Sequence, residues 1–231
     1  MREVVLDTET TGLDPAEGHR IVEVGCVELE DHVPTGRNFQ SYVDPERDIP
    51  AEATRISGID AAKLKGAPVF AAIADGLLAF LGDAPLVIHN AEFDIKFLNA
   101  EFARIGKPIL PPTRAVDTIE IAKRKFPGAR YSLDELCRRF GIDLGSRTLH
   151  GALIDAELTA QVYLELIGGR QTRLQLGPGA GTGGSSATIA KREARIRERA
   201  LAPRLNAEER EAHARFIAAE LEGDVLWRRE S

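Results

Sequence analysis

Two acidic residues near the start of the chain have a spacing that suits metal chemistry. Asp7 and Glu9 flank Thr8 directly after the short apolar run Val4–Leu6. Residues two apart on a strand point to the same face, so the two carboxylates are expected to converge. Like charges held this close are costly unless a cation lies between them, and hard oxygen ligands suit Mg²⁺ or Mn²⁺. On this spacing alone, a pair of solvated acids at a turn is an equally open interpretation.

A second acid, Asp94, follows an apolar strand-like run within the sequence His-Asn-Ala-Glu-Phe-Asp. This segment is predicted to join a strand to a helix, and the carboxyl ends of strands are where α/β folds collect ligands. The simpler alternative is an acid in the first turn of a helix, where it would complement the helix dipole.

The third candidate group is His150 with Asp155, at the start of the last predicted helix of the body. Asp155 follows the apolar pair Leu153 and Ile154, and an aspartate that faces inward from such a helix needs a partner. A solvent-facing acid near a helix start is the alternative here.

The three groups in this order resemble the DEDDh branch of the DnaQ-like exonuclease superfamily. The resemblance rests on Asp7-x-Glu9, on Asp94 within H-N-A-x-F-D, and on His150 five residues before Asp155. A histidine at that spacing distinguishes this branch from relatives that carry tyrosine. The resemblance covers residues 1–169 and implies a ribonuclease-H-like fold. Within the superfamily the chain is most similar to the proofreading subunits of bacterial replicative DNA polymerases, through the segments 7–14, 87–95 and 149–156.

The resemblance implies a 3′–5′ exonuclease that uses two divalent ions, Mg²⁺ or Mn²⁺. Asp7, Glu9 and Asp155 would bind one ion directly, with Asp7 bridging to the second and Asp94 supporting that ion through water. His150 would be the general base that deprotonates the attacking water, since imidazole suits this task near neutral pH. The product would be a 5′-nucleoside monophosphate released from a DNA 3′ end.

Five substrate contacts carry over from the same resemblance. Leu13 matches an apolar wedge against the terminal base, and Thr8 and Phe93 match the lining of the nucleotide pocket. Glu52 matches an acid near the sugar. Ser57 stands where relatives usually have histidine, which leaves one sugar or phosphate contact open. The basic run 123–125 is predicted to be a solvated helix face, with contact to the DNA backbone as the alternative.

The elements that must position these residues follow from hydrophobic periodicity. Strands are expected at Val4–Leu6, Ile21–Leu29, Phe39–Val43, Pro85–His89 and Ala115–Asp117. Helices are expected at 67–81, 93–105, through Lys123, after the capping box Ser132-x-x-Glu135, and at 152–167. Strands followed by alternating helices and strands predict an α/β domain, a mixed sheet flanked by helices.

Composition is that of one main globular domain, with 231 residues of which 43% are hydrophobic. Apolar runs are too short to span a bilayer and the charged N-terminus is unlike a signal peptide, so a cytoplasmic location is expected. Cys26 and Cys137 are predicted to be reduced, buried thiols. Residues 170–231 hold 12 Lys or Arg and 9 Asp or Glu, so residues 1–169 carry a net charge of −9. Such an acidic body argues against tight unaided binding along DNA.

The composition changes after the body. Residues 177–186 contain five glycines and two serines, which predicts a flexible linker. Residues 170–176 resemble a motif that docks into a sliding clamp, through Gln171, Leu174 and Leu176, with a frayed helix end as the alternative. Residues 187–231 are predicted to form a helical tail that binds the polymerase catalytic (alpha) subunit, anchored by Leu226 and Trp227.

Three functional hypotheses remain open on the sequence. The first is a proofreading exonuclease of a replicative polymerase, and the linker and tail favour it. The second is a free-standing DEDDh nuclease that acts on RNA ends or repair intermediates. The third is an inactive relative that serves as a binding module, which the complete set of four carboxylates and a histidine argues against.

Overall fold

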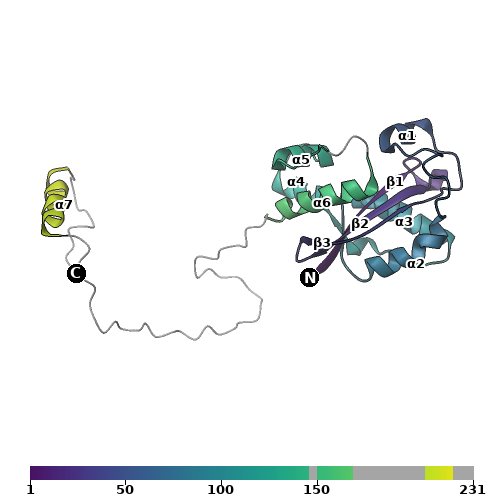
Figure 1. The fold of residues 1–231 in the computed structure, drawn as a ribbon, viewed down its shortest axis with the longest axis horizontal. Coiled ribbons are helices and arrows are strands. Elements are labelled where there is room, and N and C mark those ends of the chain that lie inside the picture. Colours follow the sequence, from purple (N-terminus) through teal and green to yellow (C-terminus); the bar gives the residue numbers. More distant parts are fainter. Residues whose placement is uncertain (146–149, 169–205, 221–231) are drawn as a thin grey trace, which may run out of the picture. The chain divides into compact units, whose positions relative to one another are not determined.

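The structure is a computed structural model that describes residues 1–145, 150–168 and 206–220 (Figure 1). The chain divides into two compact units, Met1–Leu176 and Gly177–Ser231, and each is described by itself. Several predicted features lie outside the described residues: the clamp-binding motif, the glycine-rich linker, and most of the predicted helical tail, including Leu226 and Trp227.

A five-stranded sheet forms the centre of the first unit. Its strands are β1 (Arg2–Thr10), β2 (Ile21–Glu30), β3 (Val33–Tyr42), β4 (Leu86–Ile88) and β5 (Ala115–Asp117). They lie in the order β3-β2-β1-β4-β5. The first three strands are antiparallel, whereas β4 is parallel to β1 and β5 is parallel to β4. The predicted mixed sheet with five strands is confirmed.

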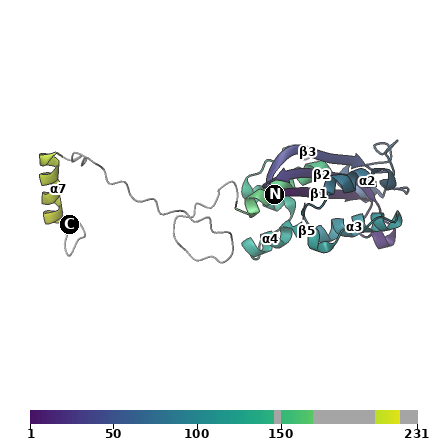
Figure 2. The ribbon, with the colours of Figure 1, turned by 90° about the horizontal axis from the view of Figure 1, so that it is seen from below.

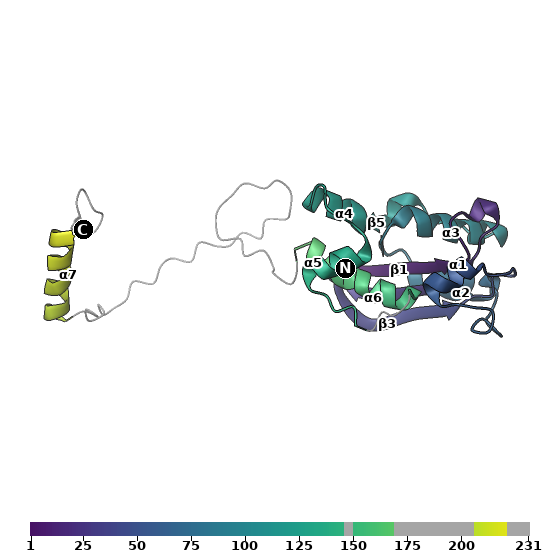
Figure 3. The same ribbon diagram turned by 90° about the horizontal axis from the view of Figure 1, so that it is seen from above.

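Helices cover both faces of this sheet. They are α1 (Ala51–Ser57), α2 (Phe70–Leu81), α3 (Ala91–Arg104), α4 (Thr118–Lys125), α5 (Leu133–Phe140) and α6 (Ala152–Leu166), with short 3₁₀ turns at Pro15–Glu17 and Pro112–Arg114. The larger apolar core joins α2 and α3 to one face, and α6 packs on the other face over β1 and β2. Figure 3 shows α6 along the strands, and Figure 2 shows short β5 between α3 and α4.

Alternation along β1 decides which face each active-site candidate occupies. Val4 and Leu6 are buried in the core with α2 and α3, whereas Val5 is buried in the core with α6. Because side chains alternate along a strand, Asp7 and Glu9 face the α6 side and Thr8 faces the α3 side. The predicted convergence of the two acids on one face is therefore confirmed.

The structure extends two of the predicted strands. β1 continues past Leu6 to Thr10 because its antiparallel pairing with β2 does not require apolar side chains, while β4 pairs only with Val4–Leu6. The second half of β1 therefore projects beyond β4. β3 begins at Val33 rather than Phe39. Its first half is exposed on both faces, so the sequence there has no alternation of apolar and polar residues that would predict a strand. Helix α1 was not predicted.

Other local predictions are confirmed. At the start of α5 the Ser132 hydroxyl accepts the backbone N–H of Glu135 at 3.4 Å, which is one half of the predicted capping box, while the Glu135 carboxylate pairs with Arg138. Cys26 and Cys137 are buried free thiols. Within the described part of the chain, none of the helices has the length and apolarity to cross a bilayer.

The second unit contains one described helix, α7 (Ala207–Glu220). It begins with a reciprocal capping box, in which the Asn206 side chain accepts the Glu209 N–H at 2.8 Å and the Glu209 carboxylate accepts the Asn206 N–H at 2.9 Å. Phe216 on this helix is 56% exposed.

Candidate active site

Three predicted site residues from distant parts of the chain meet at the end of β1. Donor atoms of Glu9, His150 and Asp155 all lie within 4.8 Å of one another. Glu9 comes from β1, Asp155 from the first turns of α6, and His150 from the segment just before it. Two carboxylate oxygens and an imidazole nitrogen at this separation form a donor set that fits a divalent cation.

His150 and Asp155 also contact each other directly. The Nδ1 atom of His150 lies 3.1 Å from the Oδ2 atom of Asp155. The backbone N–H of His150 donates to the carbonyl of Ile56 in α1 at 3.3 Å, which ties this segment to the short helix. The His150 side chain is 48% exposed and that of Asp155 is 6% exposed. The imidazole is therefore open to water, while the carboxylate beneath it is held by the fold.

Asp94 is not in this group of three and contacts β1 through Thr8. It is 3% exposed in the first turn of α3, and the Thr8 hydroxyl donates to its Oδ1 atom at 2.7 Å. Burial raises the pKa of the Asp94 carboxyl to about 7, the Thr8 hydrogen bond opposes this rise, and the negative charge of Asp117 adds to it. An ion close to Asp94 would favour its charged form.

Asp7 stands two residues before Glu9 on the same face, opposite Gly25 of β2. It is outside the group of three donor atoms within 4.8 Å that is found among the described residues. Its predicted role as a bridging ligand remains a prediction.

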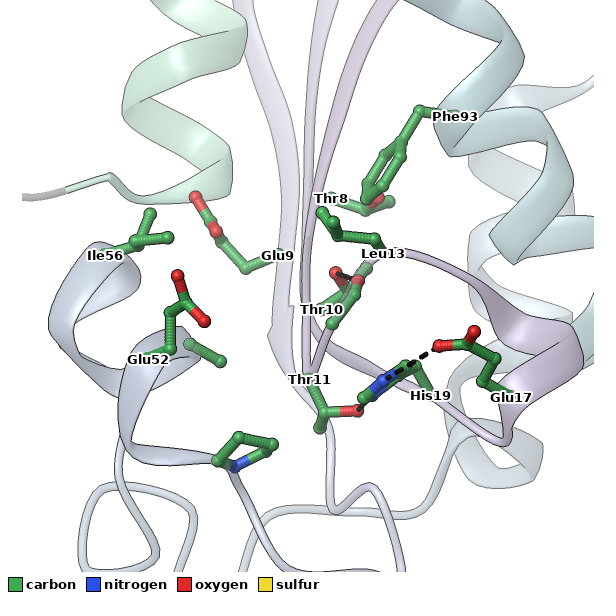
Figure 4. A pocket seen from close by; sticks show the side chains of 13 residues that line it. Thr8, Glu9, Thr10, Thr11, Leu13, Glu17, His19, Glu52, Ile56 and Phe93 are labelled. Carbon is green, nitrogen blue, oxygen red and sulfur yellow. Dashed lines mark hydrogen bonds and ion pairs between the residues drawn. The ribbon is translucent and has the colours of Figure 1, made fainter.

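A pocket of about 410 Å³ adjoins this group and shares Glu9 with it. Four of the five predicted substrate contacts line the pocket: Thr8, Leu13, Glu52 and Phe93. Figure 4 shows the carboxylates of Glu9 and Glu52 on one side of the pocket and Leu13 and Phe93 on the other. Leu13, which lines the pocket, is 83% exposed and therefore open to a ligand there. The volume lies in the usual range for small-ligand sites.

Ser57, the fifth predicted contact, is not among the residues that line the pocket. It is 3% exposed, its hydroxyl donates to the Ala53 carbonyl at 3.0 Å, and it accepts the Ile59 N–H at 3.2 Å. Both hydrogen bonds are to backbone groups at the end of α1, so the Ser57 hydroxyl is used within the protein.

The basic run at the end of α4 is engaged within the protein. Lys123 pairs with Glu120 at 2.7 Å, and Lys125 donates to the carbonyls of Glu165 and Leu166 at the end of α6. This agrees with the solvated-face interpretation.

Among the residues that line the pocket, His19 was not predicted. The ring of His19 lies against Gly12, where any Cβ atom would be only 2.3 Å from it, and the Nδ1 atom of His19 is 3.1 Å from the Thr11 hydroxyl. Only glycine leaves room for this contact. Figure 4 shows His19 below the turn that carries Leu13.

Two acids that hold helix N-termini, Asp117 and Glu23, were also not predicted. The Asp117 carboxylate accepts the N–H groups of Asn90 and Ala91 at 3.3 and 3.0 Å, at the start of α3, and that of Ile119 at 2.8 Å, at the start of α4. The Glu23 carboxylate accepts the N–H of Ala152 at 3.1 Å, at the start of α6. Asp117 is the local N-cap of α4, but its bonds to the start of α3 and the bond of Glu23 to the start of α6 join residues that are distant in sequence, so no local motif reveals them.

Comparison with known proteins decides what this arrangement is. The exonuclease family profile (RNase_T) matches residues 4–163. The DNA polymerase III subunit epsilon of Rickettsia felis is 52% identical over 179 residues, which is 76% of this chain and 78% of that protein. That of Escherichia coli is 45% identical over 177 residues, 73% of this chain and 72% of that protein. The chain belongs to the exonuclease family, among the epsilon subunits of bacterial DNA polymerase III. Its activity is that of a 3′–5′ exonuclease.

Solved structures agree with this family. The structure of exonuclease X in complex with 5′ overhanging duplex DNA is 28% identical with a TM-score of 0.57, and the match covers 71% of this chain and 90% of that chain. The nuclease domain of 3′hExo, a DEDDh family member bound to rAMP, has a TM-score of 0.63 at 20% identity, covering 72% and 91%. The predicted ribonuclease-H-like exonuclease fold is confirmed.

Proposed function

We propose that this exonuclease removes mismatched nucleotides from DNA 3′ ends by hydrolysis that depends on two divalent ions, as the proofreading subunit of a bacterial replicative polymerase in the cytoplasm. One observation carries the proposal. Two carboxylate oxygens and an imidazole nitrogen meet within 4.8 Å at the edge of a pocket that has the size of a small-ligand site and shares Glu9 with them. A scissile phosphate at that edge would lie beside the acids while its terminal nucleotide occupies the pocket.

Asp7, Glu9, Asp155 and Asp94 are the residues that would hold the ions, which the acidic character of the cluster favours. Bound divalent ions supply positive charge to the phosphate and activate water at neutral pH. The same positive charge would let an acidic body act on a polyanion. The choice between Mg²⁺ and Mn²⁺ is open to titration of each ion against activity.

His150 is the residue that would take a proton from the attacking water. Its Nδ1 atom lies within hydrogen-bond distance of the Asp155 carboxylate, at 3.1 Å. If Nδ1 donates its proton there, Nε2 carries the lone pair that can accept one. The half-exposed imidazole lies where water reaches it, and Asp155 fixes its orientation.

Leu13 and Phe93 would hold the terminal base, with Thr8 in the lining and Glu52 near the sugar. Because a paired terminal nucleotide must unpair to enter the pocket, a mismatched end costs less to bind. Ser57 makes a sugar or phosphate contact only if the end of α1 moves, since its hydroxyl is engaged there.

The direct test is excision from primers that differ only in the terminal pair. We expect a mismatched or single-stranded 3′ end to be degraded faster than a paired end with Mg²⁺ or Mn²⁺ present, and no excision with EDTA. Equal rates on matched and mismatched ends would contradict proofreading and favour a free-standing nuclease for RNA ends or DNA repair.

The second unit would join the enzyme to the polymerase catalytic (alpha) subunit. The relatives are named as subunits of DNA polymerase III, and α7 carries the exposed Phe216 on a well-capped helix. Aromatic side chains are favoured anchors at protein interfaces, so Phe216 suits a partner surface. Leu226 and Trp227 would extend this contact.

A pull-down with the polymerase catalytic subunit tests this connection. The full chain should bind, and a chain that ends at Gly177 should not, although both excise single-stranded oligonucleotides at similar rates. Equal binding by both chains would remove the support for a polymerase-bound role.

Residues 170–176 would add a weaker contact with the sliding clamp through Gln171, Leu174 and Leu176. Replacing Gln171 and Leu174 with alanine should weaken clamp binding and leave oligonucleotide hydrolysis unchanged. Unchanged clamp affinity would show that the motif has no such role.

A further inference from the structure

Glu23 is a buried acid close to the active site that none of the predicted chemistry uses. It is 1% exposed on β2, directly opposite Glu9 of β1. Its Oε1 atom accepts a hydrogen bond from the Gln40 amide on β3 at 2.7 Å, and its Oε2 atom accepts the backbone N–H of Ala152 at 3.1 Å. The Glu23 side chain thus connects two strands of the sheet, β2 and β3, to the start of α6.

The contact with Ala152 satisfies a group that a helix start leaves open. The first N–H groups of a helix have no partner within the helix, and Gly151 at the cap position has no side chain to supply one. A carboxylate also complements the positive end of the helix dipole. A carboxylate has only acceptor atoms, so it meets both donors without having to orient an amide.

The bond between Glu23 and Ala152 fixes the segment that carries two of the active-site residues. Ala152 lies between His150 and Asp155 in the chain, and Glu23 neighbours Glu9 across the sheet. Two residues along β2, Gly25 lets the backbone of Ala152 approach so closely that a Cβ atom would lie 2.3 Å from it. Glu23 and Gly25 therefore set how far the start of α6 stands from β2.

We propose that Glu23 is a positioning residue of this exonuclease: it holds the first turn of α6 so that Asp155 and His150 meet Glu9. The proposal rests on the assignment of Glu9 and Asp155 as metal ligands. Like charges on opposite strands repel, so an acid beside Glu9 is destabilising unless another interaction compensates for the repulsion. For Glu23, the N–H group of Ala152 and the positive end of the α6 dipole provide that compensation.

The other end of α6 offers a matched control. The Tyr163 hydroxyl donates to the buried Glu3 carboxylate at 2.7 Å. Tyr163→Phe removes one hydrogen bond between α6 and the sheet without touching the catalytic end. It reports what a general loosening of α6 does.

The experiment compares Glu23→Ala, Glu23→Gln and Tyr163→Phe in the full chain. Three quantities are measured: hydrogen exchange of the amides of residues 152–155 in EDTA, the Mn²⁺ concentration for half-maximal activity, and kcat and KM on a single-stranded oligonucleotide. Glu23→Ala should speed exchange at these amides, raise the Mn²⁺ requirement roughly 10- to 100-fold, and lower kcat more than it raises KM.

Glu23→Gln should restore most of each quantity. Its amide oxygen can accept the Ala152 N–H, and its NH₂ group can face the oxygen of a reoriented Gln40. Tyr163→Phe should lower the Tm while Mn²⁺ requirement and kcat stay near wild type.

Two outcomes would overturn the proposal. In one, Glu23→Ala leaves the exchange of residues 152–155 or the Mn²⁺ requirement unchanged. In the other, Tyr163→Phe lowers the Tm as much as Glu23→Ala does and causes the same changes in kcat and Mn²⁺ requirement. A wild-type chain without metal-dependent activity would instead contradict the proposed function, and the exchange measurement in EDTA would still report on the Glu23 contact.

Discussion

The α6 side and the α3 side of the active site place an acid in the same way but in different environments. Each acid lies in the first turns of a helix whose N-terminus is held by a carboxylate from a strand, Glu23 for α6 and Asp117 for α3. On the α6 side, Asp155 meets Glu9 and His150 within 4.8 Å. On the α3 side, Asp94 is enclosed, bonded to Thr8, and has its pKa raised to about 7.

This difference teaches how one sheet edge can divide the work of ion binding. The α6 side presents an assembled donor set beside the half-exposed His150. The α3 side holds an acid that must lose a proton before it can act as a ligand at full charge, so ion binding there is coupled to pH. The following predictions test this division, beginning with the largest effect.

Asp155→Ala should reduce nuclease activity to background, because it removes a donor from the assembled group. The fold should remain, since the N-terminus of α6 is still held by Glu23. Activity is measured on a single-stranded oligonucleotide and folding by circular dichroism. Full activity from a purified, folded Asp155→Ala protein would contradict the ligand assignment. Asp7→Ala gives the same test for the residue outside the group of three.

His150→Ala should lower kcat by roughly 10²- to 10⁴-fold, the usual contribution of a general base. The Mn²⁺ requirement should change little if His150 acts on water, and added imidazole should restore part of the rate. A large rise in the Mn²⁺ requirement without rescue by imidazole would instead make His150 a ligand, which its place in the donor group also permits.

Gly25→Ala should lower kcat roughly 100-fold, the cost typical of a 1 Å misplacement. The added methyl group would lie 2.3 Å from the backbone of Ala152, so α6 has to move away from β2. Gly76→Ala in α2 is the control, because its new methyl meets only Phe39 at an ordinary 3.7 Å. Equal kinetics for both variants would mean that the close approach of α6 is unimportant.

Asp94→Asn should change how the stability of the metal-free protein depends on pH. The folded protein keeps a proton on Asp94 up to pH about 7, whereas the unfolded chain loses it near pH 3.8. The free energy of unfolding therefore falls as pH rises through this window. The full change corresponds to roughly 4 kcal/mol as an upper value.

Thermal or urea unfolding in EDTA at pH 5 and pH 8 measures this effect. Asp94→Asn should gain stability relative to wild type at pH 8 and little at pH 5, and Asp48→Asn at an exposed position should show no such difference. A wild-type protein that is equally stable relative to Asp94→Asn at both pH values would contradict the buried, proton-holding state of the α3 side.

The sequence predicted the acids of the site better than the contacts that place them. Asp7, Glu9, Asp94 and Asp155 carry a recognisable order and spacing, and strand alternation explains why the first two converge. Glu23 bonds a backbone N–H that lies 129 residues further along the chain, and no local pattern encodes such a contact. The contact is evident only once α6 is seen to pack on β2.

The fold shows the same division. Strands with a buried side, such as β2, and helices with an apolar stripe, such as α2, were predicted within a few residues. The exposed first half of β3 and the seven-residue α1 have too little periodicity to be found. Yet α1 supplies Glu52, Ala53 and Ile56 to the pocket wall, so the shape of the pocket could not be foreseen even though Glu52 was.

The donor group joins Glu9 on the first strand of the body to Asp155 on its last helix. An ion bound there would link residues near the two ends of the domain's chain. A ligand that binds only the folded state stabilises that state by mass action, by about 2.7 kcal/mol at a concentration 100 times its Kd. Chelation should therefore lower the Tm and expose α6 to proteolysis. The cation supply of the cell would then govern the lifetime of this enzyme as well as its turnover.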